Sequence, residues 1–489
     1  MAEAETAYAA LEKRFARIAR IDEASGWLHW DQSVTMPPGG AEARGEQSAA
    51  LAEVSHEILA SAETGDLLAK ADAGGDPWRE ANLREMRRRY VAATALSSDL
   101  VGKLARAASA SETAWRSARE ASDFSAALPT FAALVELVKE QAAALGSALK
   151  LSPYDALLAQ YDPGRRAAEI RPTFERLKLF LGDAIPEIVA RQAHWPADES
   201  VRMPAAKQRA AGLALLKSIG FNFHHGRLDD SIHPFSTGTA EDARITARWD
   251  EADALSGLMA VLHEAGHAAY TRAQPKNWRG QPVGDDAGMT VHESQSLAFE
   301  MQAGRTPAMA GFIANLLDAD GDAVHRTLVR VEPGYIRVEA DEATYPLHVI
   351  LRFELEQALV AGDLEPADLK DAWNAEVTRN LALPAPGDRE GCLQDIHWFD
   401  GAFGYFPTYT LGALAAAQLF ETVEEKVGAE TLTAALARGD YEPLVDWMGR
   451  LVHAHGRRYP SSNALMEAAT GAPVGVEAFE RHIRRRYLI

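Results

Sequence analysis

The sequence predicts a mainly α-helical protein with one small β-sheet. Its 489 residues are rich in Ala, Leu, Glu and Arg, and apolar residues recur three and four positions apart, the spacing that gathers them on one face of a helix. Two such runs are Leu134, Val138, Ala142, Leu145 and Leu149, and Leu347, Ile350, Leu351 and Leu355. Alternating strand-like runs are scarce. The best is Asp242 to Trp249, so a small sheet is expected there.

The chain is expected to form one architectural unit, residues 1–489. No long linker and no repeat with a period of roughly 20 to 50 residues divides it. The chemically distinctive stretches all lie between His233 and Tyr409. Residues 1–220 are therefore predicted to form a helical scaffold and the wall of a cleft, and residues 221–489 to form the catalytic part.

The charge balance argues against nucleic acid and membrane surfaces as partners. The 50 Lys and Arg against 70 Asp and Glu give a formal net charge of -20, which repels phosphate backbones and anionic lipids. The longest nearly apolar stretch, Leu411 to Phe420, is shorter than the roughly 20 residues that span a bilayer. The basic tail formed by Arg481, His482 and residues 484–486 is expected to be a solvated helix end.

Cysteine usage and the amino-terminal segment predict a cytoplasmic location. Cys392 is the only cysteine, so an intrachain disulfide and a zinc site made of thiolates are both excluded. The first residues carry charges throughout and lack the apolar core of a secretory signal.

A metal-binding motif lies on a predicted helix between Asp250 and Tyr270. His263 and His267 are four residues apart, which places both imidazoles on one face, one turn apart, where they can bind a single ion. Glu264 lies beside that face, where a carboxylate can deprotonate a water whose pKa the ion lowers to about 7. The alternative is a chance match on a core helix, so a third ligand is needed.

Glu293 supplies the third ligand. It begins a second helical face that Leu297 and Met301 continue, so this helix can pass the carboxylate across the first helix. A catalytic zinc site needs three protein ligands and one open position. The set His263, His267 and Glu293, with Glu264 as the base, therefore predicts a zinc-dependent peptidase, in which Co²⁺ or Mn²⁺ can substitute for Zn²⁺.

Several separated motifs resemble those of the Taq-type metallocarboxypeptidases, the thermostable carboxypeptidase 1 family. They are LHWDQ with MPPGGAEAR (28–44), HPF (233–235), DARIT (242–246), HEAGH (263–267), HESQS (292–296), IRVEAD (336–341), CLQDIHW (392–398) and FGYFPTY (403–409). The resemblance implies a large helical peptidase fold with a deep central cleft and a small sheet near the zinc helix. It also implies a homodimer, and release of single residues from peptide substrates with a free C-terminus. One departure is the segment 300–306, where the family has E-N-x-x-G-R-S.

The same resemblance implies a set of substrate-binding residues, namely His233, Arg337, His397, Tyr405 and Tyr409. Each has an ordinary structural alternative: His233 precedes a proline and can pack a turn, the tyrosines can pack with neighbouring phenylalanines, and Arg337 lies in an acidic stretch that offers an ion pair, for example with Asp341.

Two other functions remain open on the sequence. One is an endo-acting or dipeptide-releasing zinc oligopeptidase of a related fold, which only the recognition of a free carboxylate separates from a carboxypeptidase. The other is an inactive helical binding scaffold, against which the intact Glu264 argues.

Overall fold

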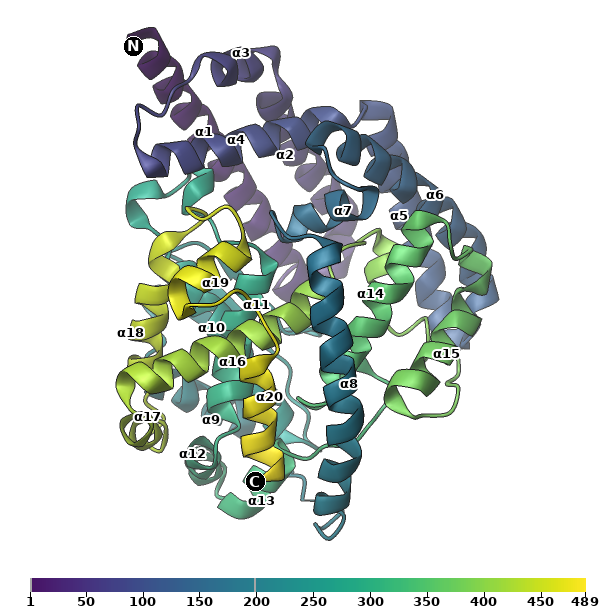
Figure 1. The fold of residues 1–489 in the computed structure, drawn as a ribbon, viewed down its shortest axis with the longest axis vertical. Coiled ribbons are helices and arrows are strands. Elements are labelled where there is room, and N and C mark those ends of the chain that lie inside the picture. The colour runs from purple at the N-terminus through teal and green to yellow at the C-terminus, as the bar shows by residue number, and fades with distance from the viewer. Residues whose placement is uncertain (1, 198) are drawn as a thin grey trace. The chain divides into compact units, whose positions relative to one another are not determined.

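The computed structural model describes residues 2–197 and 199–489 (Figure 1). Within these ranges the chain is mainly α-helical, with helices α1 to α20 and one three-stranded sheet, so the predicted fold class is confirmed. The chain folds into two compact units, each assembled from three stretches. The first comprises Met1–Ala93, Trp195–Val329 and Gly412–Val474, and the second comprises Thr94–His194, Arg330–Leu411 and Gly475–Ile489.

The first unit contains the sheet and more of the helices than the second unit. Its helices are α1 (Ala2–Val34), α2 (Ala41–Ala60), α3 (Ala62–Lys70), most of α4 (Pro77–Ala95), α9 (Ala205–Ser218), α10 (Ala254–Ala273), α11 (Met289–Leu297), α12 (Pro307–Leu317), α13 (Gly321–Leu328), most of α16 (Pro407–Val427), α17 (Ala429–Leu436), α18 (Glu442–Leu451) and α19 (Ser462–Thr470). Short 3-10 turns are η1 (Pro38–Gly40), η2 (Lys276–Trp278), η3 (Pro282–Gly284) and η8 (His453–His455), and η4 (Ala298–Gly304) is a π-helical turn.

The regular secondary structure in the described residues of the second unit is entirely helical. Its helices are α5 (Ser98–Ala121), α6 (Phe124–Leu149), α7 (Pro153–Tyr161), α8 (Ala167–Gln192), α14 (Tyr345–Ala361), α15 (Leu369–Leu381) and α20 (Glu477–Ile483). The short turns are η5 (Arg337–Glu339), η6 (Pro366–Asp368), η7 (His397–Asp400) and the π-helical η9 (Arg484–Leu488).

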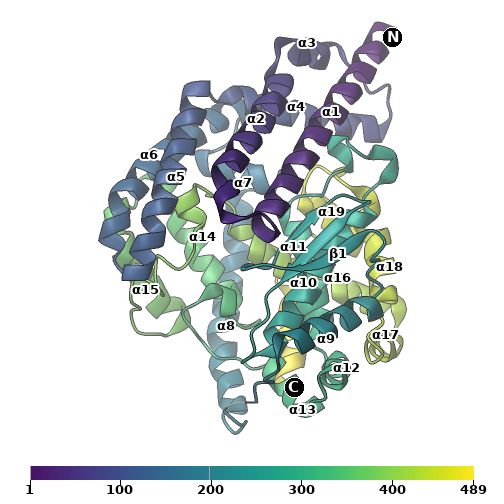
Figure 2. The same cartoon turned by 180° about the vertical axis from the view of Figure 1, so that it is seen from behind.

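The sheet lies where the sequence places it, next to the helix with the metal motif. Its strands are β1 (Gly226–Asp230), β2 (Ser236–Gly238) and β3 (Ala243–Ala247), in the order β1-β3-β2. Strand β1 is parallel to β3, with Leu228 opposite Ile245, and β2 is antiparallel to it. Ile245 and Ala247 are fully buried, and β3 packs against α10 (Figure 2).

Each unit has a central helix that is buried on most of its surface. In the first unit α10 is such a helix, and in the second α14 is. The core side chains of α10 include Leu255, Leu258, Val261 and Leu262, and those of α14 include Leu347, Ile350, Leu351 and Phe353. An apolar face that extends around most of a helix is typical of a core helix, so the groups that these two helices carry are held in rigid surroundings.

Several other predictions from the sequence concern domain boundaries, membrane crossing and the single cysteine. The boundary at residue 220 between scaffold and catalytic part stays a prediction, as does the deep cleft. No helix within residues 2–197 and 199–489 combines the length and the hydropathy that a membrane crossing requires. Cys392 is buried, and burial raises the pKa of its thiol to about 12, so this thiol is unreactive.

Glu356 joins three segments in the core of the second unit. Its carboxylate accepts hydrogen bonds from the hydroxyl of Tyr154, from the indole N–H of Trp398 at 3.1 Å and from the backbone N–H of Gly404 at 3.3 Å. Burial raises the pKa of Glu356 to about 7, although these hydrogen bonds favour the ionised form.

The raised pKa of Glu356 predicts a loss of stability with rising pH. An unfolded glutamate titrates near 4.5, so between that value and about 7 the folded state binds the extra proton. The contribution is full below the unfolded pKa and is lost as the pH rises through about 7. From about pH 5 to about pH 8 the wild type should lose roughly 2.5 kcal/mol relative to Glu356→Gln. Thermal melts of both proteins at the two pH values check this, and a Tm difference independent of pH contradicts it.

Candidate active site

Helix α10 presents His263 and His267 because its sequence fixes both its start and its rotation. The side chain of Asp253 caps the helix by accepting from the backbone N–H groups of Leu255 and Ser256. The apolar residues of the helix face the core, and this sets the direction of the remaining face. The two imidazole rings lie with their centroids 4.9 Å apart, as the four-residue spacing predicts.

Glu293 reaches these rings because two glycines allow its surroundings to close. A Cβ atom on Gly266 of α10 would lie 2.5 Å from the carbonyl oxygen of Gln295 on α11, so the two backbones are in direct contact. A Cβ atom on Gly412 of α16 would lie 2.7 Å from Cβ of Glu293. Only glycine fits at either position, and Glu293 is therefore packed between α10 and α16.

The three predicted ligands converge with the geometry of a metal site. Oε2 of Glu293 lies 3.6 Å from Nε2 of His267 and 3.9 Å from Nε2 of His263, and all three ligand atoms lie within 4.8 Å of one another. Metal–ligand bonds of about 2.0–2.2 Å in a tetrahedron separate ligand atoms by roughly 3.4 Å. A small approach of the three ligand atoms toward one another would therefore complete the site. Among the residues that the structure describes, no other group of His, Cys, Asp and Glu converges in this way.

A carboxylate supports His263 from the side opposite the site. Nδ1 of His263 lies 3.1 Å from Oε2 of Glu300, whose Oε1 accepts a hydrogen bond of 2.7 Å from Nη2 of Arg305. Glu300 lies in the π-helical turn that follows α11, and the wider turn changes which residues face α10. Because a carboxylate accepts the proton of Nδ1, Nε2 is left free to bind a metal.

His292 supports the second imidazole. Nδ1 of His292 lies 2.7 Å from Nδ1 of His267, so one of the two nitrogens donates to the other. With Nε2 of His267 directed at the site, its Nδ1 is the donor and Nδ1 of His292 accepts. Burial and the neighbouring His292 lower the pKa of His267 well below its usual value, which favours the neutral ring that a metal needs.

Burial and the neighbouring charges set the pKa values of Glu264 and His263. Burial raises the pKa of Glu264 to about 7, and the charges of Glu293 and Glu300 act in the same direction against His263. For His263, burial lowers the pKa, but Glu293 and Glu300 outweigh it and raise the pKa to about 10. Without a cation this pocket therefore holds a protonated imidazole among carboxylates. A divalent ion would replace that proton, so the donor set fits a metal.

Four of the five predicted substrate-binding residues lie together in the second unit, and His233 lies in the first. His233 is on the exposed loop between β1 and β2, where its backbone oxygen accepts from the hydroxyl of Ser231. Its imidazole has no hydrogen-bond partner among the described residues.

Arg337 is buried and paired with Asp395, a partner that the sequence analysis did not identify. Nε and Nη2 of Arg337 both donate to the carboxylate of Asp395, at 2.8 to 3.2 Å. The expected alternative partner, Asp341, instead accepts from backbone N–H groups at the start of α14. Arg352 donates to the same carboxylate, and the two guanidinium groups hold the pKa of Asp395 far below its usual value despite burial.

His397, Tyr405 and Tyr409 form an aromatic group around Arg337. Nε2 of His397 lies 3.4 Å from the hydroxyl of Tyr409, and the rings of Tyr405 and Tyr409 are 5.1 Å apart. The guanidinium of Arg337 lies 4.9 Å from the centre of the Tyr409 ring. Burial lowers the pKa of His397 to about 4, with Arg337 acting in the same direction, so the imidazole is neutral at physiological pH.

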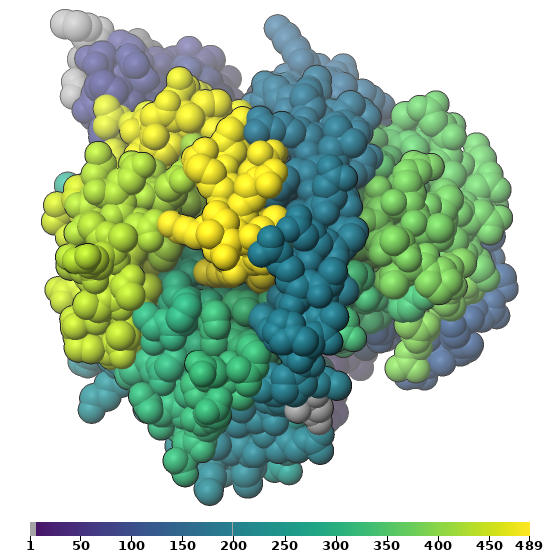
Figure 3. All heavy atoms as spheres, turned by 60° about the horizontal axis from the view of Figure 1, so that its bottom comes forward, coloured from purple at the N-terminus to yellow at the C-terminus, as the bar shows by residue number. Residues whose placement is uncertain are grey.

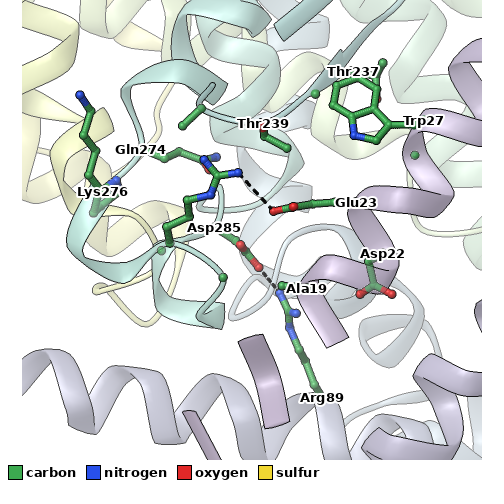
Figure 4. A pocket seen from close by; sticks show the side chains of 17 residues that line it. Ala19, Asp22, Glu23, Trp27, Arg89, Thr237, Thr239, Gln274, Lys276 and Asp285 are labelled. Carbon is green, nitrogen blue, oxygen red and sulfur yellow. Dashed lines mark hydrogen bonds and ion pairs between the residues drawn. The ribbon is translucent and has the colours of Figure 1, made fainter. Parts of the chain in front are cut away.

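A pocket of about 320 Å³ lies in the first unit between α1, the β2 region and residues 274–285 (Figure 4). None of the candidate ligands lines it. Its charged walls are largely paired, since Arg89 contacts Asp285 and Nη2 of Arg279 lies 3.7 Å from Glu23. The pocket therefore offers no convergent set of donors comparable to the metal site.

Sequence reasoning missed three residues that support the site. Asp395 and His292 both lie inside motifs that were recognised, CLQDIHW and HESQS, so their positions were visible but their partners were not. Glu300 lies in the segment that departs from the family pattern, and its position depends on a π-helical turn that no helical periodicity predicts.

Comparison with known proteins agrees with this geometry. The sequence matches the family model described as carboxypeptidase Taq (M32) metallopeptidase over residues 10–487. It is 38% identical over 483 residues to thermostable carboxypeptidase 1 of Thermus thermophilus, with 94% of each chain covered. It is 32% identical over 486 residues to carboxypeptidase 1 of Bacillus subtilis, with 96% of each covered. The structure superposes on that of metallocarboxypeptidase 1 of Trypanosoma cruzi with a TM-score of 0.95, 33% identity and 99% of both chains covered.

Replacing Glu300 by Gln should weaken metal binding without removing a ligand. The amide cannot supply the negative charge that holds the proton on Nδ1 of His263, so metal affinity should fall by roughly 10- to 100-fold. Competition with a chromophoric chelator measures the affinity. The exposed carboxylate of Glu63, which pairs with Arg14, provides a matched control in Glu63→Gln. Equal affinities in Glu300→Gln and the wild type would show that Glu300 does not support the ligand.

Proposed function

The chain belongs to the carboxypeptidase Taq (M32) metallopeptidase family, and on this premise we propose roles for the residues of its active site. It is a metallocarboxypeptidase, a peptide hydrolase that releases amino acids from the carboxyl ends of peptides. The endo-acting oligopeptidase and the inactive scaffold are therefore set aside. The convergence of His263, His267 and Glu293 beside Glu264 is the observation that carries the assignment of roles.

We assign zinc to the site formed by His263, His267 and Glu293. Two imidazole nitrogens and one carboxylate oxygen leave one position open, as in catalytic zinc sites. Co²⁺ and Mn²⁺ are the expected substitutes. When bound, the ion would polarise the scissile carbonyl and make an attacking water more acidic.

Glu264 is the proposed general base. Its carboxylate lies on α10 next to His263, and its buried position places its pKa near 7, where a group can both accept and return a proton. Glu264 takes the proton of the attacking water and delivers it to the leaving nitrogen. Because Glu264 is not a ligand, its role is separable from metal binding.

Arg337 is the proposed recognition site for the substrate carboxylate. Asp395 occupies Nε and Nη2 of Arg337 and fixes the plane of its guanidinium. Nη1 has no hydrogen-bond partner among the described residues, so this edge is left to bind a carboxylate oxygen. The pairing with Asp395 therefore favours binding of the substrate carboxylate through Nη1 over two parallel hydrogen bonds from Nε and Nη2.

His233, His397, Tyr405 and Tyr409 are proposed to contact the peptide. The two tyrosine hydroxyls and the neutral imidazole of His397 are donors of the kind that stabilise a developing oxyanion. The exposed imidazole of His233 leaves both ring nitrogens available for the substrate backbone. The homodimer and the cytoplasmic location stay predictions, and the net charge of -20 continues to argue against nucleic acid as a partner.

The two glutamates of the metal motifs should respond differently to substitution. Glu264→Gln should retain about one equivalent of zinc and lose several orders of magnitude in kcat, because the base is absent and the ligands remain. Glu293→Ala should lose both zinc affinity and turnover. Elemental analysis and steady-state kinetics measure the two quantities. Near-normal turnover in Glu264→Gln, or full zinc content in Glu293→Ala, would contradict the assigned roles.

Recognition of the terminal carboxylate should depend on Arg337. Amidating the carboxyl end of a peptide should abolish most cleavage, and Arg337→Lys should lower kcat/KM by the equivalent of about 2 to 4 kcal/mol, the range for losing one partner of a buried charge pair. Zinc content should be unchanged. Because Asp395 would lose its bidentate partner, a thermal melt is measured alongside. Equal cleavage of free and amidated peptides by the wild type would exclude Arg337 as a carboxylate anchor.

A further inference from the structure

The basic carboxyl-terminal tail is partly buried, contrary to the solvated helix end that the sequence suggests. His482 and Tyr487 are less than 9% exposed, and the side chain of Arg486 is 10% exposed. The exposed members are Arg481, Arg484 and Arg485. The tail therefore presents one face to the protein and the other to solvent.

The buried face of the tail converges on one carboxylate, that of Glu342. Nε2 of His482 donates to Oε1 of Glu342 at 2.7 Å, while Nη1 of Arg486 and the hydroxyl of Tyr487 donate to Oε2 at 2.8 and 2.9 Å. The side chain of Glu342 is fully buried. A buried carboxylate is tolerated only when it is paired and hydrogen-bonded, so the loop that carries Glu342 depends on the tail.

That loop is the one that carries Arg337. Its two ends are joined where the backbone N–H of Glu332 donates to Asp341 at 3.1 Å. Its tip is held by Gln394, which accepts from the backbone N–H of Arg337 at 2.9 Å. Glu342 follows the closing residue directly, so the tail is attached at the base of the loop.

The tail is in turn fixed to α8. Arg176 on α8 contacts Glu477 and Glu480 of α20, and the guanidinium of Arg484 lies 4.9 Å from the centre of the Phe180 ring. Figure 3 shows the carboxyl-terminal residues, in yellow, lying against the blue surface of this helix. The loop is thus connected through Glu342 and the tail to a helix of 26 residues.

We propose that residues 477–489 form a brace that positions Arg337, by pairing with Glu342 at the base of the loop that spans Glu332 and Asp341. The inference rests on the proposed role of Arg337 as the anchor for the substrate carboxylate. Glu342, His482, Arg486 and Tyr487 are positioning residues, since they act through the loop and do not touch substrate.

The test compares two identical substitutions on the same tail. Arg486→Gln removes a cation from Glu342, and Arg485→Gln removes an exposed cation from the neighbouring position. In Arg486→Gln, hydrogen exchange of the amides in residues 332–345 should accelerate about tenfold, and KM for a free-carboxylate peptide should rise about tenfold, as expected when a hydrogen bond to a charged group is lost. kcat and zinc content should stay near the wild-type values. Arg485→Gln should change none of these quantities.

Two further variants, Tyr487→Phe and Arg337→Lys, separate the effect of the brace from poor folding and from the anchor role of Arg337. Tyr487→Phe removes one hydrogen bond without removing charge, so it should shift exchange and KM in the same direction by a smaller factor even if Arg486→Gln folds poorly. Unchanged exchange in residues 332–345, or accelerated exchange with an unchanged KM, would overturn the brace. Arg337→Lys is measured in parallel: if it left KM unaltered, the anchor role of Arg337 would fail, while the exchange data would still decide whether the tail holds the loop.

Discussion

The direct backbone contact between α10 and α11 at Gly266 is the constraint on which the metal site depends. Helix α10 carries two of the candidate ligands and the proposed base, and α11 carries the third candidate ligand. The side chains of His and Glu reach only a limited distance from the backbone. The two helices must therefore approach closely for the three donor atoms to lie within 4.8 Å of one another. Any side chain at position 266 would meet the backbone of Gln295, and the resulting displacement would be transmitted to Glu293. The destabilising glycine inside a core helix is thus explained by the approach of its neighbour.

Beyond the ligands, buried charged groups in both units are fixed by partners that also set the direction of a neighbouring side chain. Arg305 holds Glu300, and Glu300 orients His263. In the second unit, Asp395 lies between Arg337 and Arg352 and orients the fork of Arg337. Such pairs add little net stability, because the cost of removing charges from water offsets their attraction. Their effect is geometric, since they limit the rotamers of the groups that are proposed to meet metal and substrate.

The sequence was sufficient for features that depend on local spacing. The four-residue step from His263 to His267, the helical face that begins at Glu293 and the alternation in DARIT predicted two helices and the strand β3. Features that depend on contacts far apart in the sequence were not predictable. Asp395 pairs with Arg337 across 58 positions, and Glu342 meets Arg486 across 144. The tail was misjudged for the same reason: composition predicts solvation, and only a distant buried carboxylate makes a basic residue favourable in the interior.

The buried thiol of Cys392 makes this chain a convenient background for site-directed labelling. With its only cysteine enclosed and its pKa raised to about 12, the wild-type protein should give almost no reaction with maleimides at neutral pH. Two cysteines, one introduced on an exposed helix of each unit, would then be the reactive positions. A fluorophore pair attached there would report the distance between the units in solution, with and without a peptide bound, and no native residue would first have to be removed.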